Sequence, residues 1–176
     1  MIKLLFLFLI SINCFAQHAK KVFPEDYFGI YKGNLEIVNQ NGIQTIEMEF
    51  HLVANQEAGK YEYTIVYIAN GNLQERKYNL IEKDKEKGEY VVDENNGIFL
   101  NAQWFGNTLF SMFEVQGNII TTTERFYDDK MEFEITFSSR KKEEKSGGTS
   151  DDIPEVISYP ITVFQKAVLK KSQSED

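Results

Sequence analysis

The stretch MEFEITF, residues 131–137, alternates apolar and polar side chains without interruption. Its apolar residues, which fall on one face of an extended chain, are Met131, Phe133, Ile135 and Phe137. Its polar residues fall on the other face. A period of two is typical of an antiparallel strand with one face packed in a core and the other in solvent. The stretch therefore predicts a half-buried β-strand.

The same alternation continues on both sides of this stretch, for example in IEMEFHLV, residues 46–53, and in YEYTIVYIA, residues 61–69. Turn signals such as Asn41-Gly42 and Asn70-Gly71 separate the runs, and Asn-Gly suits a two-residue hairpin. Apart from a short turn at 23–28, no stretch shows helical periodicity. We predict ten strands, near residues 28–39, 43–55, 60–69, 73–83, 89–94, 98–105, 108–115, 119–127, 131–139 and 157–169.

Hairpin connections between neighbouring strands predict an all-β fold, an antiparallel up-and-down meander. A meander of this length leaves two long edges exposed unless it closes on itself. We therefore expect a single domain over residues 27–171, an antiparallel up-and-down β-barrel of about ten strands. Apolar residues make up 42% of the chain and aromatic residues 14%, which is enough for a core.

Residues 1–16 have the layout of a cleaved signal peptide. Lys3 precedes an unbroken apolar run at 4–10, and we predict cleavage after Ala16. The run is shorter than the about 20 residues of a membrane-spanning helix, so no transmembrane span is expected. A lipoprotein signal would make Cys14 the acylated N-terminus, but Asn13 and Ser11 occupy the places of its small and aliphatic residues, which disfavours it. We expect a periplasmic or secreted protein.

The mature chain begins with a tail at 17–26 and lacks cysteine once Cys14 has been removed with the signal. It therefore offers no disulfide, no thiolate zinc site and no cysteine nucleophile. The whole chain has a formal net charge of -8. An acidic chain without a basic stripe repels phosphate backbones, so no nucleic-acid partner is expected.

Residues 138–156 differ in composition from the rest of the chain. They are charged at the start, rich in glycine and serine in the middle, and acidic at the end. This composition predicts a long flexible loop between the last two strands. The residues at 172–176 are predicted to form a solvated C-terminal tail.

The first predicted strand contains Gly29, Tyr31 and Gly33 in the order Gly-x-Tyr-x-Gly. This motif resembles the Gly-x-Trp-x-Gly opening of the calycin superfamily, which includes lipocalins and fatty-acid-binding proteins. The resemblance implies a barrel that encloses a small-molecule cavity, with Tyr31 plugging one end. The last strand departs from fatty-acid-binding proteins, because Gln165 and Lys166 stand in place of their Arg-x-Tyr pair.

Few residues of this chain are candidates for catalysis. His51 shares the outward face of its strand with Glu47 and Glu49, which is typical of a solvated surface histidine. Glu132 and Glu134 also face outward, where nothing raises a carboxyl pKa enough for acid catalysis at neutral pH. We therefore expect no enzymatic activity, no catalytic residue, no metal site and no cofactor.

The aromatic residues and one arginine are the candidates for ligand binding. Aromatic rings can pack a barrel core, or they can line an apolar cavity in which tyrosine hydroxyls orient a ligand. If the face with Thr121 and Thr123 points inward, Arg125 can meet an anionic group of a ligand. If the opposite face, with Ile120, Thr122 and Phe126, points inward, Arg125 faces outward. The candidate ligand-binding residues are Tyr31, Tyr63, Tyr67, Trp104, Phe113, Arg125 and Phe133.

Two functions remain from the sequence. The first is an exported binding protein for a small apolar or amphipathic molecule. The alternative is a non-catalytic protein-interaction module or inhibitor of the cell envelope, which acts on an envelope partner through the loop at 138–156.

Overall fold

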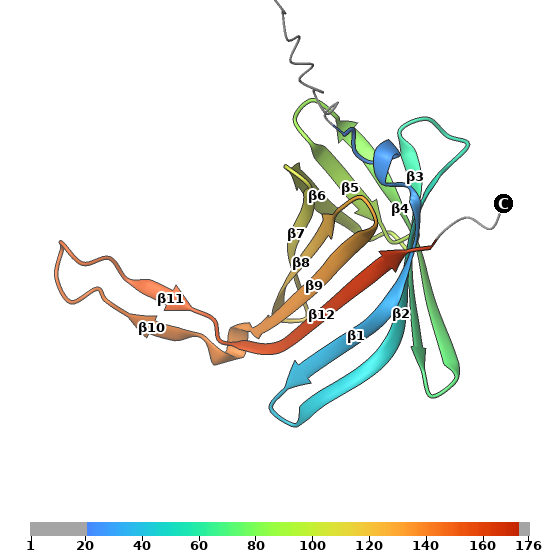
Figure 1. Ribbon diagram of the computed structural model, residues 1–176. Coiled ribbons are helices and arrows are strands. Elements are labelled where there is room, and N and C mark those ends of the chain that lie inside the picture. The colour runs from blue at the N-terminus through green and yellow to red at the C-terminus, as the bar shows by residue number, and fades with distance from the viewer. Residues whose placement is uncertain (1–20, 173–176) are drawn as a thin grey trace, which may run out of the picture.

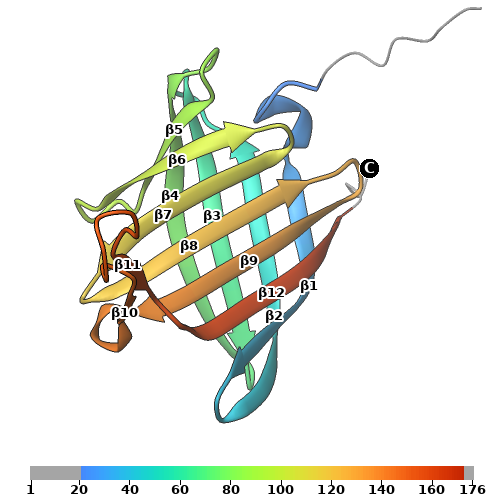
Figure 2. The ribbon, with the colours of Figure 1, turned by 90° about the vertical axis from the view of Figure 1, so that its left-hand side faces the viewer.

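The computed structural model describes residues 21–172. One sheet closes on itself in the strand order β1-β12-β9-β8-β7-β6-β5-β4-β3-β2, and a two-stranded sheet, β10-β11, stands apart from it (Figures 1 and 2). All neighbouring strands in the barrel are antiparallel. The predicted all-β, up-and-down barrel of about ten strands is confirmed. The predicted signal peptide at 1–16 and the last four residues lie outside the described part of the chain.

The strands follow the predicted runs closely, with one shift near the C-terminus. The tenth strand was predicted at 157–169, but it begins at Ile161, after Pro160. The elements are η1 (Glu25–Tyr27), β1 (Gly29–Asn39), β2 (Gly42–Ala54), β3 (Lys60–Ala69), β4 (Asn72–Asp84), β5 (Glu89–Asp93), β6 (Phe99–Phe105), β7 (Thr108–Val115), β8 (Asn118–Phe126), β9 (Lys130–Ser139), η2 (Arg140–Lys142), β10 (Glu144–Ser146), β11 (Val156–Ser158) and β12 (Ile161–Lys171).

Hairpin turns join the strands as the glycine signals predicted. At the β3-β4 turn, Asn70 and Gly71 both have positive φ, 51° and 76°. Positive φ at both central residues defines the primed turn whose twist matches that of two antiparallel strands. This turn explains why Asn-Gly stands between two long alternating runs.

Closure of the barrel depends on β1, which pairs with β2 on one side and with β12 on the other. Gly33 allows the β12 backbone to approach closely, because a Cβ at this position would lie 2.6 Å from the carbonyl oxygen of Val168. The second glycine of the Gly-x-Tyr-x-Gly motif is therefore required by the seam that closes the sheet.

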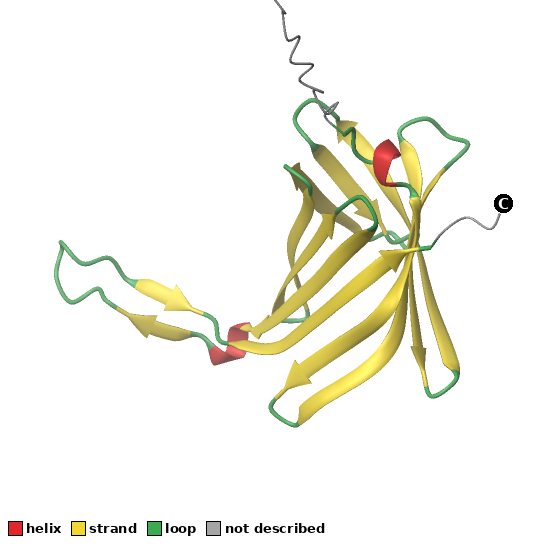
Figure 3. Ribbon diagram, viewed as in Figure 1, coloured by secondary structure: helices red, strands yellow, loops and turns green. Residues whose placement is uncertain are grey.

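The two ends of the barrel differ. At one end lies the short helix η1 (Figure 3). Phe23, which the sequence analysis places in a tail at 17–26, is buried at this end. The turns after β1, β3, β5 and β7 lie at the other end, together with η2, which buries none of its residues.

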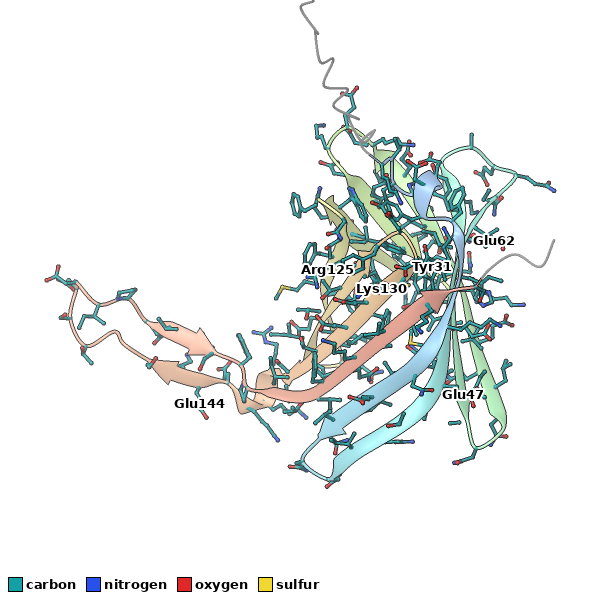
Figure 4. All side chains as sticks on the ribbon, viewed as in Figure 1. Tyr31, Glu47, Glu62, Arg125, Lys130 and Glu144 are labelled. Atoms are coloured by element: carbon teal, nitrogen blue, oxygen red, sulfur yellow. The ribbon has the colours of Figure 1, made fainter. Side chains whose placement is uncertain are left out.

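The predicted loop at 138–156 contains regular structure. Ser138 and Ser139 belong to β9, and β10 and β11 then form a hairpin that projects from the barrel. Figure 4 shows Glu144 on this arm, away from the barrel wall. Every residue of β10 and β11 is exposed. Among residues 21–172, no helix is long and apolar enough to cross a membrane.

Candidate functional site

Aromatic side chains fill the end of the barrel next to η1. Phe23 stacks on Trp104 with ring centroids 3.9 Å apart and an interplanar angle of 13°, and Tyr27 packs against both Trp104 and Phe126. Rings at these distances interact favourably and exclude water. We call this set, Phe23, Tyr27, Tyr31, Trp104 and Phe126, the aromatic plug.

Tyr31 lies in the plug, the place that the resemblance to calycins implied for it. Its side chain is fully buried, and its hydroxyl donates a hydrogen bond to the backbone carbonyl of Tyr27 at 2.5 Å. Its ring meets Phe126 edge to face at 5.9 Å. Burial raises the pKa of the Tyr31 hydroxyl to about 12, so this group stays neutral and acts as a hydrogen-bond donor.

Below the plug, the barrel contains a cavity of about 310 Å³. A second space of about 350 Å³ adjoins it toward the open end and shares Tyr67, Arg76, Ile135 and Phe137 with it. Most of the wall is apolar or aromatic. The polar residues that line the 310 Å³ cavity are Tyr63, Tyr67, Arg76, Tyr78, Glu94, Ser111, Thr122 and Glu124.

The predicted ligand-binding residues are divided among three places. Tyr63, Tyr67, Phe113 and Phe133 line the cavity together. Tyr31 and Trp104 belong to the aromatic plug instead. The third place is the outer wall, where Arg125 lies.

Arg125 does not face the lumen, so the inward phase that its predicted ligand contact required is not the one in the structure. In β8, Ile120, Glu124 and Phe126 are buried, so Arg125 falls in the outward phase. Its Nη1 atom lies 3.4 Å from Oε2 of Glu132 on the neighbouring strand. This face of β8 points inward because Phe126 packs in the aromatic plug. That long-range contact is not evident from alternation alone.

Glu124 is the buried charge that the sequence reasoning missed. It is 1% exposed, and its Oε1 atom accepts a hydrogen bond from the Tyr63 hydroxyl at 3.0 Å. Burial raises the pKa of the carboxyl to about 7, and the hydrogen bond from Tyr63 offsets part of this rise. The signal was present in the sequence, because Glu124 stands two residues before Phe126 and four after Ile120.

The tyrosines around Glu124 remain neutral at neutral pH. Burial raises the pKa of Tyr63, Tyr67 and Tyr78 above their ordinary value. The rings of Tyr63 and Tyr78 lie nearly parallel, with centroids 6.4 Å apart. These hydroxyls can donate and accept hydrogen bonds inside an otherwise apolar space.

Arg76 is the cation of this site, and the sequence analysis did not select it. It projects from β4 where the two spaces meet, with its guanidinium 5.2 Å from the centroid of the Tyr67 ring. No carboxylate forms an ion pair with Arg76 within residues 21–172. A guanidinium stacked on a ring and without a carboxylate partner is suited to bind an anionic group.

Other titratable residues do not extend this site. Within the described part of the chain, no group of three or more His, Cys, Asp or Glu residues is arranged to hold a metal ion. His51 pairs with Glu49 at 2.8 Å, on the face of β2 opposite the buried Met48 and Phe50. The polar chemistry of the lumen is therefore that of Glu124, its tyrosine neighbours, Arg76 and Glu94, with the hydroxyls of Ser111 and Thr122.

Comparisons with known proteins bear on the fold. No protein-family model and no curated protein matches this sequence. The chain is similar to a solved structure, that of the S-type phycobiliprotein lyase CPES from Guillardia theta, with a TM-score of 0.59 and 6% sequence identity over 86% of this chain and 91% of that chain. At this identity the likeness shows the fold alone, and it agrees with a lipocalin-like barrel.

Proposed function

We propose that this protein binds a small amphipathic molecule inside the open half of its barrel. The observation that carries the proposal is the cavity of about 310 Å³, whose aromatic wall contains a few convergent polar groups. Small-molecule sites are commonly apolar spaces of about 300–1,000 Å³ with a few placed polar groups. The similar fold of a lyase that acts on phycobiliproteins supports a small-molecule role at the level of fold only.

Arg76 and Glu124 favour an amphipathic ligand in one orientation. Arg76 lies toward the open end, where it can pair with an anionic group of the ligand. Glu124 lies deeper, beside Tyr63, and disfavours a second anion there. A ligand with an acidic group at Arg76 and an apolar body between Phe113 and Phe133 satisfies both constraints.

We further propose that the protein is exported and that it binds its ligand without catalysing a reaction. The lumen combines two carboxyls, those of Glu94 and Glu124, with neutral phenols and hydroxyls. The apolar run at residues 4–10 behind Lys3 supports export. Mass spectrometry of the exported protein tests this, with Gln17 as the expected N-terminus; an acylated Cys14 would contradict it.

A pair of variants on one strand tests the cavity. A fatty acid with a terminal dansyl group serves as the probe, because its emission rises when it leaves water. Ile135→Trp places a large ring in the lumen, where Ile135 lines both spaces. We expect it to weaken binding at least about ten-fold, since the ring takes the volume of the buried chain.

Glu134→Trp is the matched control, because Glu134 precedes Ile135 on β9 and faces outward toward Lys166. It should bind the probe as the wild type does. Failure of the wild-type protein to bind any apolar acid saturably, or equal losses in the two variants, would contradict the proposal.

The projecting arm supports a second candidate function, that of a module that binds an envelope protein. Residues 144–158 stand away from the barrel and expose Ile153, Val156 and Ile157. Exposed apolar side chains on a projecting hairpin are suited to contact a partner.

A trimmed variant tests this second function. Residues 144–158 are replaced by a short Gly-Ser turn, which keeps β9 and β12 intact. We expect loss of chemical crosslinking to the envelope partner while the Tm and probe binding stay unchanged. Crosslinking that survives the replacement would exclude the arm as the contact surface.

A further inference from the structure

The barrel wall is incompletely paired between β6 and β7. These strands pair only at Ala102-Ser111, Gln103-Phe110, Trp104-Leu109 and Phe105-Thr108. Phe99 to Asn101 of β6 pair with β5 alone, and Met112 to Val115 of β7 pair with β8 alone. Toward the open end, each strand therefore has an edge that meets no partner in this wall.

The cavity reaches this unpaired section from inside. Leu100 of β6 and Phe113 and Val115 of β7 all line the 310 Å³ space. A groove of about 770 Å³ lies against the same section from outside. Ser111 and Thr122 line both spaces, so the groove lies directly across the wall from the cavity.

Large apolar side chains lie on the outer side of the unpaired section, together with the polar Asn101. Met112 is 70% exposed and Phe99 is 63% exposed, and Phe110 lines the groove beside Met112. Apolar side chains grouped at the mouth of a cavity mark a surface that an apolar ligand covers. The other exit from the lumen lies at the open end, where Asn72, Gln74 and Gln165 line the space.

We propose that the bound molecule crosses the wall between β6 and β7, with its polar end inside the cavity and a flexible apolar chain lying in the outer groove against Phe110 and Met112. This inference rests on the proposed function and specifies its ligand class, an amphiphile with a chain too long for the cavity. The section without pairing between Phe99–Asn101 of β6 and Met112–Val115 of β7 provides the path.

A series of n-alkanoic acids of increasing chain length tests the inference by displacement of the fluorescent probe. Each fully buried methylene strengthens binding by about four-fold, and a methylene lying in an open groove by about half that factor. We expect affinity to keep rising for chains longer than the cavity. In the double variant Phe110→Ser/Met112→Ser, affinity should stop rising at the length that fills the cavity.

The matched control removes exposed apolar side chains at the open end. Ile43 is 71% exposed and Leu73 is 65% exposed, on β2 and β4 next to the hairpin turns there. Ile43→Ser/Leu73→Ser should preserve the full chain-length dependence. The inference is wrong if Ile43→Ser/Leu73→Ser loses the rise in affinity for long chains while Phe110→Ser/Met112→Ser keeps it. It is also wrong if both double variants keep that rise.

A nitroxide at the chain end gives a direct readout that needs no substitution. It should broaden the amide NMR signals of Phe110, Met112 and Thr121, which surround the groove. Broadening of Ile43 and Leu73 instead would place the chain at the open end and overturn the inference. Short acids separate the two proposals: if they bind but longer ones gain nothing, only the crossing of the wall fails, whereas absence of all binding removes the proposed function too.

Discussion

The closed and open halves of this barrel both carry aromatic side chains, but they use them differently. In the closed half, Phe126 is 1% exposed and contacts Phe23, Tyr27 and Tyr31. In the open half, Phe113 is only partly buried and borders a cavity. The difference comes from the segment before β1, which fills one end, whereas η2 at the other end buries none of its residues. Aromatic content alone therefore does not decide whether a barrel interior is packed or hollow.

Truncation of one ring in each half should produce the largest contrast. Phe126→Ala should lower the free energy of unfolding by about 3–5 kcal/mol, because it leaves a void in a tightly packed cluster. Phe113→Ala should cost about 1–2 kcal/mol, because its ring already borders empty space. Urea denaturation of both variants measures this. Equal losses would mean that the open half is as tightly packed as the plug.

Glu124 should make the stability of the open half depend on pH. Its pKa rises from 4.5 when unfolded to about 7 when folded, because burial disfavours the charged form. Between these values the folded state keeps a proton that the unfolded state releases, so stability falls as pH rises. The full loss, on the order of 3 kcal/mol, is reached above about pH 7.

Glu124→Gln should remove this dependence, so that the variant becomes more stable than the wild type as pH rises through that window. Denaturation series between about pH 4.5 and 8 measure the difference. Glu132→Gln on the outer wall is the control with the opposite sign, since the hydrogen bond from Lys130 lowers the pKa of Glu132. A wild-type and Glu124→Gln pair with parallel pH profiles would show that Glu124 is not buried in solution.

Substitutions of Arg76, at the lumen, and Arg125, on the outer wall, should have different but smaller effects on probe binding. Arg76→Gln should weaken binding of an acid-bearing probe by about two- to five-fold, the range of an exposed ion pair. Arg125→Gln should leave binding unchanged, because its partner is Glu132 on the outside. Probe titration in low salt measures both. A larger loss from Arg125→Gln would restore the interpretation from sequence.

The ion pair that holds η1 should contribute least. Lys85 pairs with Glu25 of η1 and with Glu82, and these side chains are partly exposed. Lys85→Gln should lower the free energy of unfolding by less than about 1 kcal/mol. Phe23→Ala, a few residues away, should cost several times more, because its ring packs in the plug. Urea denaturation of both variants would show whether packing or charge holds the segment.

Local patterns were enough to predict the strands and the closure of the barrel. The alternation at 131–137 and the Asn70-Gly71 turn each depend on neighbours in sequence, and the structure has them where they were predicted. The Gly-x-Tyr-x-Gly motif led to Tyr31, whose place at the covered end follows from the strand in which it lies.

The features that could not be predicted from the sequence depend on long-range contacts. Phe23 was assigned to a tail because nothing in residues 21–27 alternates, and its burial depends on Trp104 far along the chain. Glu124 shares its phase of β8 with Ile120 and Phe126, but the other phase also carries an apolar residue, and packing decides that Glu124 faces inward and Arg125 outward. The extent of pairing between β6 and β7 likewise has no signature in either strand.

The seam between β1 and β12 has a consequence for how the chain folds. The first barrel strand obtains its second neighbour only from the last, with Tyr31 opposite Lys171. Contacts so distant in sequence slow folding, since the intervening chain must be ordered before they form. During synthesis, β1 and β9 must therefore keep a bare edge until the C-terminal strand has been released, and the nascent chain is most prone to aggregate in that interval.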